Sequence, residues 1–170
     1  MRIPFGPIAL VSAICLGLAQ PVTAQEVTLP FGNLKHDTKQ AVEIVSDSFT
    51  VSQNRGSAEF VGNVVVGQGE MRLSAGKIVV EYQVKDGKPT GQIGRMMASE
   101  GVTLVSGKEA AEAKNATYSL IDGLIVMEGD VLLTQSNNAL AGQKVVIDLK
   151  DGSAKVEGRV KTIFKAGASQ

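Results

Sequence analysis

The sequence predicts an all-β protein in which short, twisted antiparallel strands stack into a jellyroll or solenoid. Three observations indicate this fold: apolar residues recur at every second position from Ala41 onward, turn-forming residues interrupt them at short intervals, and one stretch repeats after 67 residues. No stretch of comparable length has the 3.6-residue period of an amphipathic helix, so we expect strands throughout the domain.

The segment before this domain is expected to direct export. Arg2 gives residues 1–24 a positive start, residues 8–18 are predominantly apolar, and Ala24 offers the small residue that signal peptidase favours. The apolar run is shorter than the roughly 20 residues that a membrane-spanning helix needs. We therefore predict a signal peptide that is cleaved after Ala24.

The composition of the exported chain excludes several classes of function. Cys15, the only cysteine, lies within the predicted signal peptide, so cleavage removes any disulfide, cysteine-bound metal or thiol nucleophile. Without Arg2 the chain has 16 basic and 17 acidic residues, a balance that does not attract nucleic acid. Aromatic residues make up 4% of the sequence, so stacking surfaces for bases are scarce. We predict no cofactor and no metal.

The exported chain divides into a leader and a series of strands. Residues 25–40 are polar, contain Pro30 and Gly32 and have no sustained period, so we expect a leader outside the core. From Ala41 onward, apolar residues at alternate positions mark strands with one buried face. These residues are Val42, Ile44, Phe49, Val51, Ala58, Phe60, Val64, Val66, Met71, Leu73, Ile78, Val80, Tyr82, Ala116, Tyr118, Leu120, Val145, Ile147 and Leu149. Lys114, two residues before Ala116, is a polar exception on that face.

Turn signals separate the predicted strands. Gly and Asn adopt the positive φ angles that tight hairpins require. The signals are Asn54-Arg55-Gly56, Gly67-Gln68-Gly69, Asp86-Gly87-Lys88-Pro89, Asp122-Gly123, Ser136-Asn137-Asn138 and Asp151-Gly152. Their spacing is typical of a meander of short strands and explains the high glycine content without a phosphate-binding loop.

Self-comparison reveals a repeated unit of strand, turn, strand, turn and strand. Residues 60–66 align at a shift of 67 with residues 127–133, and the alignment continues without a gap until Gln68 meets Gln135 and beyond. A looser copy at a shift of 38 places Val102 on Val64. Such units bury their apolar faces only by stacking. We therefore expect a rolled, two-walled sheet with apolar residues between the walls.

The residues expected between the walls form one apolar stripe. It comprises Val64, Val66, Leu73, Ile78, Val80, Val102, Leu104, Tyr118, Val131, Leu133, Leu140, Val145 and Ile147. Alternating apolar residues serve equally to pack a protein core and to line a lipid-binding groove, so the pattern alone leaves both interpretations open.

One polar pair invites a catalytic interpretation. His36, the only histidine, is next to Asp37, and such a pair can act in acid–base catalysis. It lies in the aperiodic leader without a nucleophile or metal-binding partner, so we interpret it as a solvated or capping residue. No paired carboxylates, Cys–His or Ser–His arrangement or metal-ligand spacing stands out, and we predict that the protein is not an enzyme.

Several short motifs resemble one known family. In order along the chain they are Ser46-Asp47-Ser48, Ala58-Glu59-Phe60-Val61-Gly62-Asn63-Val64, Gln68-Gly69, Leu73-Ser74-Ala75, Glu100-Gly101-Val102, Ala113 to Tyr118, Met127-Glu128-Gly129-Asp130-Val131 and Leu140-Ala141-Gly142-Gln143-Lys144-Val145. Together they resemble the LptA/OstA family of periplasmic lipopolysaccharide-transport proteins over about 120 residues. One departure is Ser74-Ala75-Gly76, where the family often carries Ala-Asp; we interpret the lost carboxylate as a local turn variation.

The resemblance implies a fold and a function. The fold is an OstA-like β-jellyroll at residues 41–165, between the leader at 25–40 and a tail at 166–170. The function is that of a periplasmic carrier or bridge in Gram-negative outer membrane biogenesis, which binds the lipid A acyl chains of lipopolysaccharide in an apolar groove lined by the stripe. The implied partners are lipopolysaccharide, the periplasmic domain of LptC, the N-terminal domain of LptD and head-to-tail copies of the same chain. Unpaired strand edges at both ends of a roll fit such pairing.

Two other functions stay open. A membrane-linked relay of the LptC type would keep the fold, although the short apolar run and the Ala24 site argue against a retained anchor. A structural β-solenoid module of a fibre or adhesin would also use stacked strands, although about three irregular repeats do not suit a long fibre.

Overall fold

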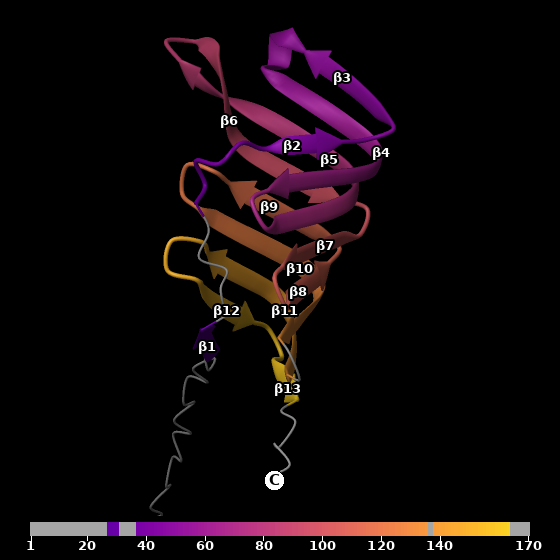
Figure 1. The fold of residues 1–170 in the computed structure, drawn as a ribbon, viewed down its shortest axis with the longest axis vertical. Coiled ribbons are helices and arrows are strands. Elements are labelled where there is room, and N and C mark those ends of the chain that lie inside the picture. The colour runs from indigo at the N-terminus through magenta and orange to yellow at the C-terminus, as the bar shows by residue number, and fades with distance from the viewer. Residues whose placement is uncertain (1–26, 31–36, 136–137, 164–170) are drawn as a thin grey trace, which may run out of the picture.

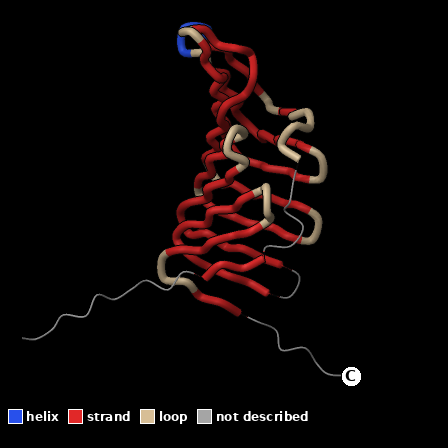
Figure 2. Tube along the Cα trace, turned by 90° about the vertical axis from the view of Figure 1, so that its left-hand side faces the viewer, coloured by secondary structure: helices blue, strands red, loops and turns tan. Residues whose placement is uncertain are grey.

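The structure is a computed structural model that describes residues 27–30, 37–135 and 138–163. Within these ranges the chain forms a 13-stranded antiparallel sheet that rolls into a twisted stack (Figures 1 and 2), and the all-β prediction is confirmed. The short helical turn η1 (Gln53–Arg55) follows β3. The strands are β1 (Val27–Pro30), β2 (Glu43–Val45), β3 (Ser48–Ser52), β4 (Ser57–Gln68), β5 (Met71–Lys85), β6 (Lys88–Ser99), β7 (Val102–Ser106), β8 (Glu109–Ala113), β9 (Asn115–Ser119), β10 (Leu124–Gln135), β11 (Asn138–Asp148), β12 (Ser153–Glu157) and β13 (Lys161–Ile163).

Four of the five long strands, β4, β5, β10 and β11, give the sheet two walls, because each of these four pairs with different neighbours at its two ends. Wall 1 contains β2, β7, β8 and β13 together with the ends of the long strands that pair with them. Wall 2 contains β3, β6, β9, β12 and β1 together with the opposite ends. These four strands therefore cross from one wall to the other at a bend, here called the corner.

Backbone irregularities place the corner inside the strands. The β4–β5 register shifts between Val61 and Val64, and the β10–β11 register shifts between Glu128 and Val131. In each shift a glycine has a positive φ, +83° at Gly62 and +86° at Gly129. A bulge with a left-handed glycine bends a strand without ending it. The two bulges are equivalent positions of the 67-residue repeat, which explains why both halves fold over in the same way.

Close packing of successive chain segments at the corner explains its glycines. A Cβ atom on Gly129 would lie 2.9 Å from Cβ of Lys114, and one on Gly76 would lie 2.7 Å from Cβ of Glu100. Gly76 is thus an interior residue of β5 where another segment passes over the backbone. The sequence interpretation of Ser74-Ala75-Gly76 as a turn variation is therefore wrong, because these residues continue the strand.

The core lies between the walls, but one predicted buried face is exposed. Phe49 and Val51 of β3 are 56% and 52% exposed, although they alternate with polar residues as a buried face should. β3 pairs only with β4 among the described strands and stands at the end of the stack. The ring of Phe49 covers that of Phe60 at a centroid distance of 4.8 Å. Alternation is therefore present at this end, but no further strand in the described part of the chain covers these side chains.

The leader differs from the prediction in one respect. β1 lies within residues 25–40 and pairs antiparallel with β12, which places the start of the described chain at the far end of the stack from β2 (Figure 1). A four-residue strand is too short for its period to be recognised in the sequence. The predicted signal peptide, His36, the tail at 166–170 and the Ser136-Asn137 part of one predicted turn lie outside the described residues.

Candidate functional site

The interior between the walls is the candidate site. The structure places the whole predicted stripe on the inner faces of the two walls, and none of its residues is more than 5% exposed. Wall 1 contributes Val64, Val66, Leu73, Val102, Leu104, Val131, Leu133 and Leu140, and wall 2 contributes Ile78, Val80, Tyr118, Val145 and Ile147. They pack into a single apolar cluster, so side chains fill the space between the walls. Their contact with lipid stays a prediction.

The stripe omitted several residues of the same interior. Met71, Met96 and Met127 are buried between the walls, and so are Ile125 and Leu149. The alternation that identified the stripe includes these positions, so the signal was present in the sequence. Methionine side chains are flexible and adapt to neighbours of different shape, which gives this interior a capacity to rearrange that Val and Ile do not provide.

One polar connection crosses the apolar interior. The hydroxyl of Tyr118, on wall 2, donates a hydrogen bond to Oε1 of Gln68, on wall 1, at 2.8 Å. Both residues are 1% exposed, and burial raises the pKa of Tyr118 to about 12. Nε2 of Gln68 donates in turn to the backbone oxygens of Thr38 (3.0 Å) and Gln40 (2.9 Å). Gln68 is not among the predicted site residues, although its recurrence as Gln135 in the repeat is a signal in the sequence.

Gln135 makes a different contact at the equivalent strand end. Its Nε2 donates to Oε1 of Glu109 at 3.0 Å. Glu109 is 7% exposed, and its Oε2 has no hydrogen-bond partner among the described residues. Both copies of the repeat therefore place a glutamine amide at the equivalent strand end, but the two amides bind different groups.

The ends of the stack expose strand edges and apolar side chains. At one end, β2 and β3 each have β4 as their one partner within residues 27–30, 37–135 and 138–163, and Val45, Phe49 and Val51 are exposed. At the other end β13 pairs with β11 only among the described strands, while β1 covers the edge of β12. Unpaired edges of this kind can accept a strand from another sheet.

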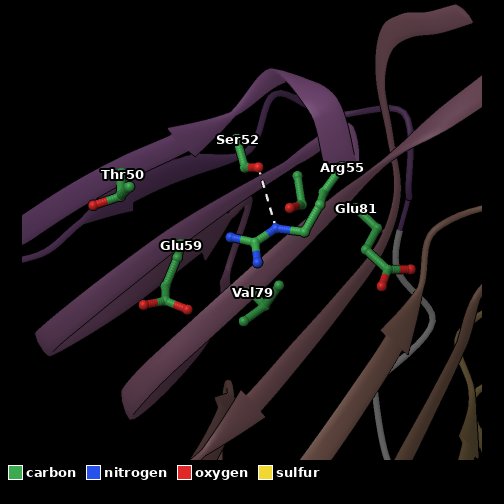
Figure 3. A pocket seen from close by; sticks show the side chains of 7 residues that line it. Thr50, Ser52, Arg55, Glu59, Val79 and Glu81 are labelled. Carbon is green, nitrogen blue, oxygen red and sulfur yellow. Dashed lines mark hydrogen bonds between the residues drawn. The ribbon is translucent and has the colours of Figure 1, made fainter.

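A separate hollow of about 330 Å³ lies on the outer face of wall 2 (Figure 3). It is lined by Thr50, Ser52, Arg55, Ser57, Glu59, Val79 and Glu81, and Nε of Arg55 donates to Oγ of Ser52 at 3.1 Å. Its carboxylates form ion pairs, Glu59 with Lys77 at 2.9 Å and Glu81 with Arg95 at 2.5 Å. Both carboxylates that line the hollow are therefore paired with a cation on the same outer face.

The described residues contain no candidate metal site, because no group of three or more His, Cys, Asp or Glu side chains is arranged there to hold an ion. No helix in the same ranges reaches the length and apolarity of a membrane span.

The sequence is similar to proteins of known families. Residues 43–153 match the family described as LptA/(LptD N-terminal domain) LPS transport protein. An uncharacterized protein of Rhizobium meliloti is 29% identical over 151 residues, which are 85% of this chain and 81% of that protein. The lipopolysaccharide export system protein LptA of Haemophilus influenzae is 27% identical over 162 residues, 90% of this chain and 89% of LptA. LptA of Escherichia coli K12 is 25% identical over 146 residues, 81% of this chain and 76% of LptA.

A solved structure shares the fold. LptH, the LptA homologous periplasmic component of the lipopolysaccharide transport device of Pseudomonas aeruginosa, matches with a TM-score of 0.66 over 76% of this chain and 99% of that chain, at 17% identity. At this identity the likeness establishes the fold alone. The two-walled roll described above is therefore a β-jellyroll of the LptA type.

Proposed function

Because the chain belongs to the LptA/(LptD N-terminal domain) family of lipopolysaccharide transport proteins, we propose that it is a non-enzymatic periplasmic carrier that holds the acyl chains of lipid A between its two walls. The observation that supports this most directly is the apolar interior, which runs through the stack from Val64 to Ile147. A buried CH₂ group contributes about 0.8 kcal/mol, so ten such groups would contribute roughly 8 kcal/mol before the cost of separating the walls.

The proposal requires the walls to move apart. The stripe residues already contact one another, so an acyl chain must replace contacts between the walls with contacts to itself. Because the walls are joined at the corner and end in separate turns on the opposite side, the side away from the corner is where they can separate. We call this the open side.

The ends of the stack support the proposed partners. The free edges of β2 and β3 at one end and of β13 at the other fit strand pairing with related jellyrolls, which we propose to be LptC, the N-terminal domain of LptD or further copies of this chain. Such pairing would join the interiors into one path between the membranes. The proposed domain spans residues 41–165, with a leader at 25–40 and a tail at 166–170.

Photocrosslinking to purified lipopolysaccharide tests the carrier function with matched controls in the same strands. A photoreactive residue at Val66 or Leu133 faces the interior, whereas the adjacent Val65 and Leu132 face outward and are 38% and 39% exposed. We expect crosslinks at the two inner positions and few at the outer ones. Crosslinking that is equal at both faces, or no greater than at exposed Lys150, would contradict a lipid site between the walls.

Export has a separate test, which also distinguishes the carrier from a membrane-linked relay. We propose that the chain is cleaved after Ala24, so the periplasmic protein should begin at Gln25. Sequencing of its amino terminus decides between the two: a chain that keeps residues 1–24 and sediments with membranes would favour the LptC-type alternative.

A further inference from the structure

We infer that residues 37–42, here called the strap, close the open side of the roll, that Gln68 latches the strap in place, and that acyl chains enter the interior when the strap is released. The inference rests on the proposed function for the identity of the cargo. The strap and its latch are features of the structure itself and can be tested without lipid.

The position of the strap indicates a cover. It precedes β2, which belongs to wall 1, and Thr38, Lys39 and Val42 share a hollow of about 570 Å³ with residues of wall 2 and its rim. The wall 2 residues of this hollow are Gln83, Gln92 and Ile93, joined by Leu120 and Ile121 of the β9–β10 turn. In Figure 1 the indigo segment before β2 runs down the side where the β9–β10 turn lies. The strap therefore extends from one wall to the rim of the other.

Few interactions hold the strap. Within the described ranges, the hydrogen bonds from the strap to the roll are the two that Nε2 of Gln68 donates, to the oxygens of Thr38 and Gln40. Two further bonds are local, because Asp37 accepts from the backbone nitrogens of Lys39 and Gln40 through Oδ1 and O. The local turn thus presents both carbonyl oxygens to one side chain. Val42, where the strap meets β2, is partly buried against the apolar cluster, and Thr38 is the one other strap residue that is not exposed. A segment anchored at so few points opens more easily than the core.

The latch also ties the walls together. Gln68 uses both hydrogens of its amide on the strap and accepts the Tyr118 hydroxyl of wall 2 with its oxygen. Separation of the walls at this point breaks the Tyr118 bond, which is one of the three hydrogen bonds that fix the Gln68 amide. The amide then turns more freely and holds the strap less firmly, so opening of the roll and release of the strap are coupled through one buried side chain. The hollow beside the strap provides space for it to move.

The Gln68→Leu variant tests the latch, with Gln135→Leu as its matched control. Both remove a glutamine amide at equivalent ends of the repeat, but Gln135 bonds Glu109 and not the strap. The strap amides that donate hydrogen bonds are those of Lys39 and Gln40, within the turn that Gln68 holds. In Gln68→Leu we expect hydrogen exchange of these two amides to rise about 30-fold, the factor expected for two hydrogen bonds of ordinary net strength. Amides in β10 should stay protected. Equal strap exchange in Gln68→Leu and wild type, or an equal rise in Gln135→Leu, would overturn the latch.

A second variant separates strap release from general loosening. Gln68→Leu leaves the Tyr118 hydroxyl without its partner, and the added change Tyr118→Phe removes that hydroxyl. The double variant should recover stability to urea but keep the fast strap exchange. Recovery of slow exchange together with stability would show that the strap responds to core stability and not to Gln68, which would overturn the latch.

Access to the interior links the strap to function. In a Cys15→Ser background, a thiol introduced by Met96→Cys lies at a position that is 4% exposed and paired with Tyr118, so maleimide should label it faster when Gln68→Leu is added. Lipopolysaccharide uptake should accelerate in the same variant without Met96→Cys. If Gln68→Leu accelerates labelling, and the wild type binds lipopolysaccharide but takes it up as fast as Gln68→Leu does, the strap is not the entrance. If no variant binds lipopolysaccharide while labelling still follows Gln68, the carrier function fails and the latch stands.

Discussion

Substitution of Gly129 by alanine should destabilise the jellyroll through the corner, without touching the apolar interior. Gly129 has a φ of +86°, and an added Cβ would lie 2.9 Å from Cβ and 3.0 Å from Cδ of Lys114. Gly87 is the matched control, because its φ is +73° and no atom lies within 4 Å of a Cβ built on it. The two variants share the backbone penalty and differ only in packing.

The magnitude follows from three contributions. A positive φ costs an L-residue about 1–2 kcal/mol, and overpacking typically costs about 1–3 kcal/mol. The lower entropy of alanine in the unfolded chain offsets about 0.4–1 kcal/mol in both variants. We therefore expect Gly129→Ala to lower the free energy of unfolding by about 1–5 kcal/mol, with a central value of about 3 kcal/mol, and Gly87→Ala by about 0–1.5 kcal/mol.

Equilibrium urea unfolding measures both variants, and a third variant isolates the clash. Lys114→Gly removes the side chain that covers Gly129. In that background, the effect of Gly129→Ala should fall to that of Gly87→Ala. Equal destabilisation by Gly129→Ala and Gly87→Ala would refute the argument that close packing of neighbouring segments requires glycine at the corner. An undiminished effect in the Lys114→Gly background would refute the assignment of the clash to Lys114.

Two further predictions concern the interior. Because burial raises the pKa of Tyr118 from 10.0 to about 12, the neutral phenol stabilises the folded protein below pH 10, and this contribution is lost as the pH rises towards 12; wild type should lose roughly 2–3 kcal/mol more than Tyr118→Phe over this interval. Parallel urea-unfolding profiles of the two proteins between pH 9 and about 12 would contradict this. Leu133→Ala should cost about 2–5 kcal/mol and Leu132→Ala, its outward neighbour in β10, under about 1 kcal/mol; similar thermal shifts in the two would contradict the assignment of faces.

Alternation in the sequence was sufficient to predict the walls, because each wall has one apolar and one solvated face. A strand in such a sheet must place every second residue in the core, so Val64, Val66 and Leu133 could be assigned to the interior without any knowledge of strand order. The repeat predicted in addition that the two halves stack, and Gly62 and Gly129, which both have a positive φ, occupy the same position in its two copies. Both signals are local or periodic, and for that reason they can be recognised from the sequence alone.

Features that depend on contacts between distant segments could not be predicted in this way. Gly76 resembles a turn residue, yet it lies inside β5 because Glu100 packs over it. β1 is recognised only by its pairing with β12, which is more than 120 residues away in the chain. Exposure of Phe49 depends on the absence of a described neighbour beyond β3. In each case a segment remote in sequence determines the local structure, and the sequence around the residue does not identify that segment.

The bond between the walls is a departure from the repeat and not a product of it. Tyr118 aligns with Val80 at the shift of 38, and Val80 aligns with Ile147 at the shift of 67, so the other two copies are aliphatic at this position. Gln68 recurs as Gln135, but Gln135 bonds Glu109. A stack that needed only to bury apolar surface would gain more from a third aliphatic residue than from a phenol whose hydroxyl must find a buried partner. Tyr118 lies opposite Gln68, the glutamine that also holds the strap. Coupling of the strap to wall 2 requires this pairing of tyrosine and glutamine, whereas packing of the core does not.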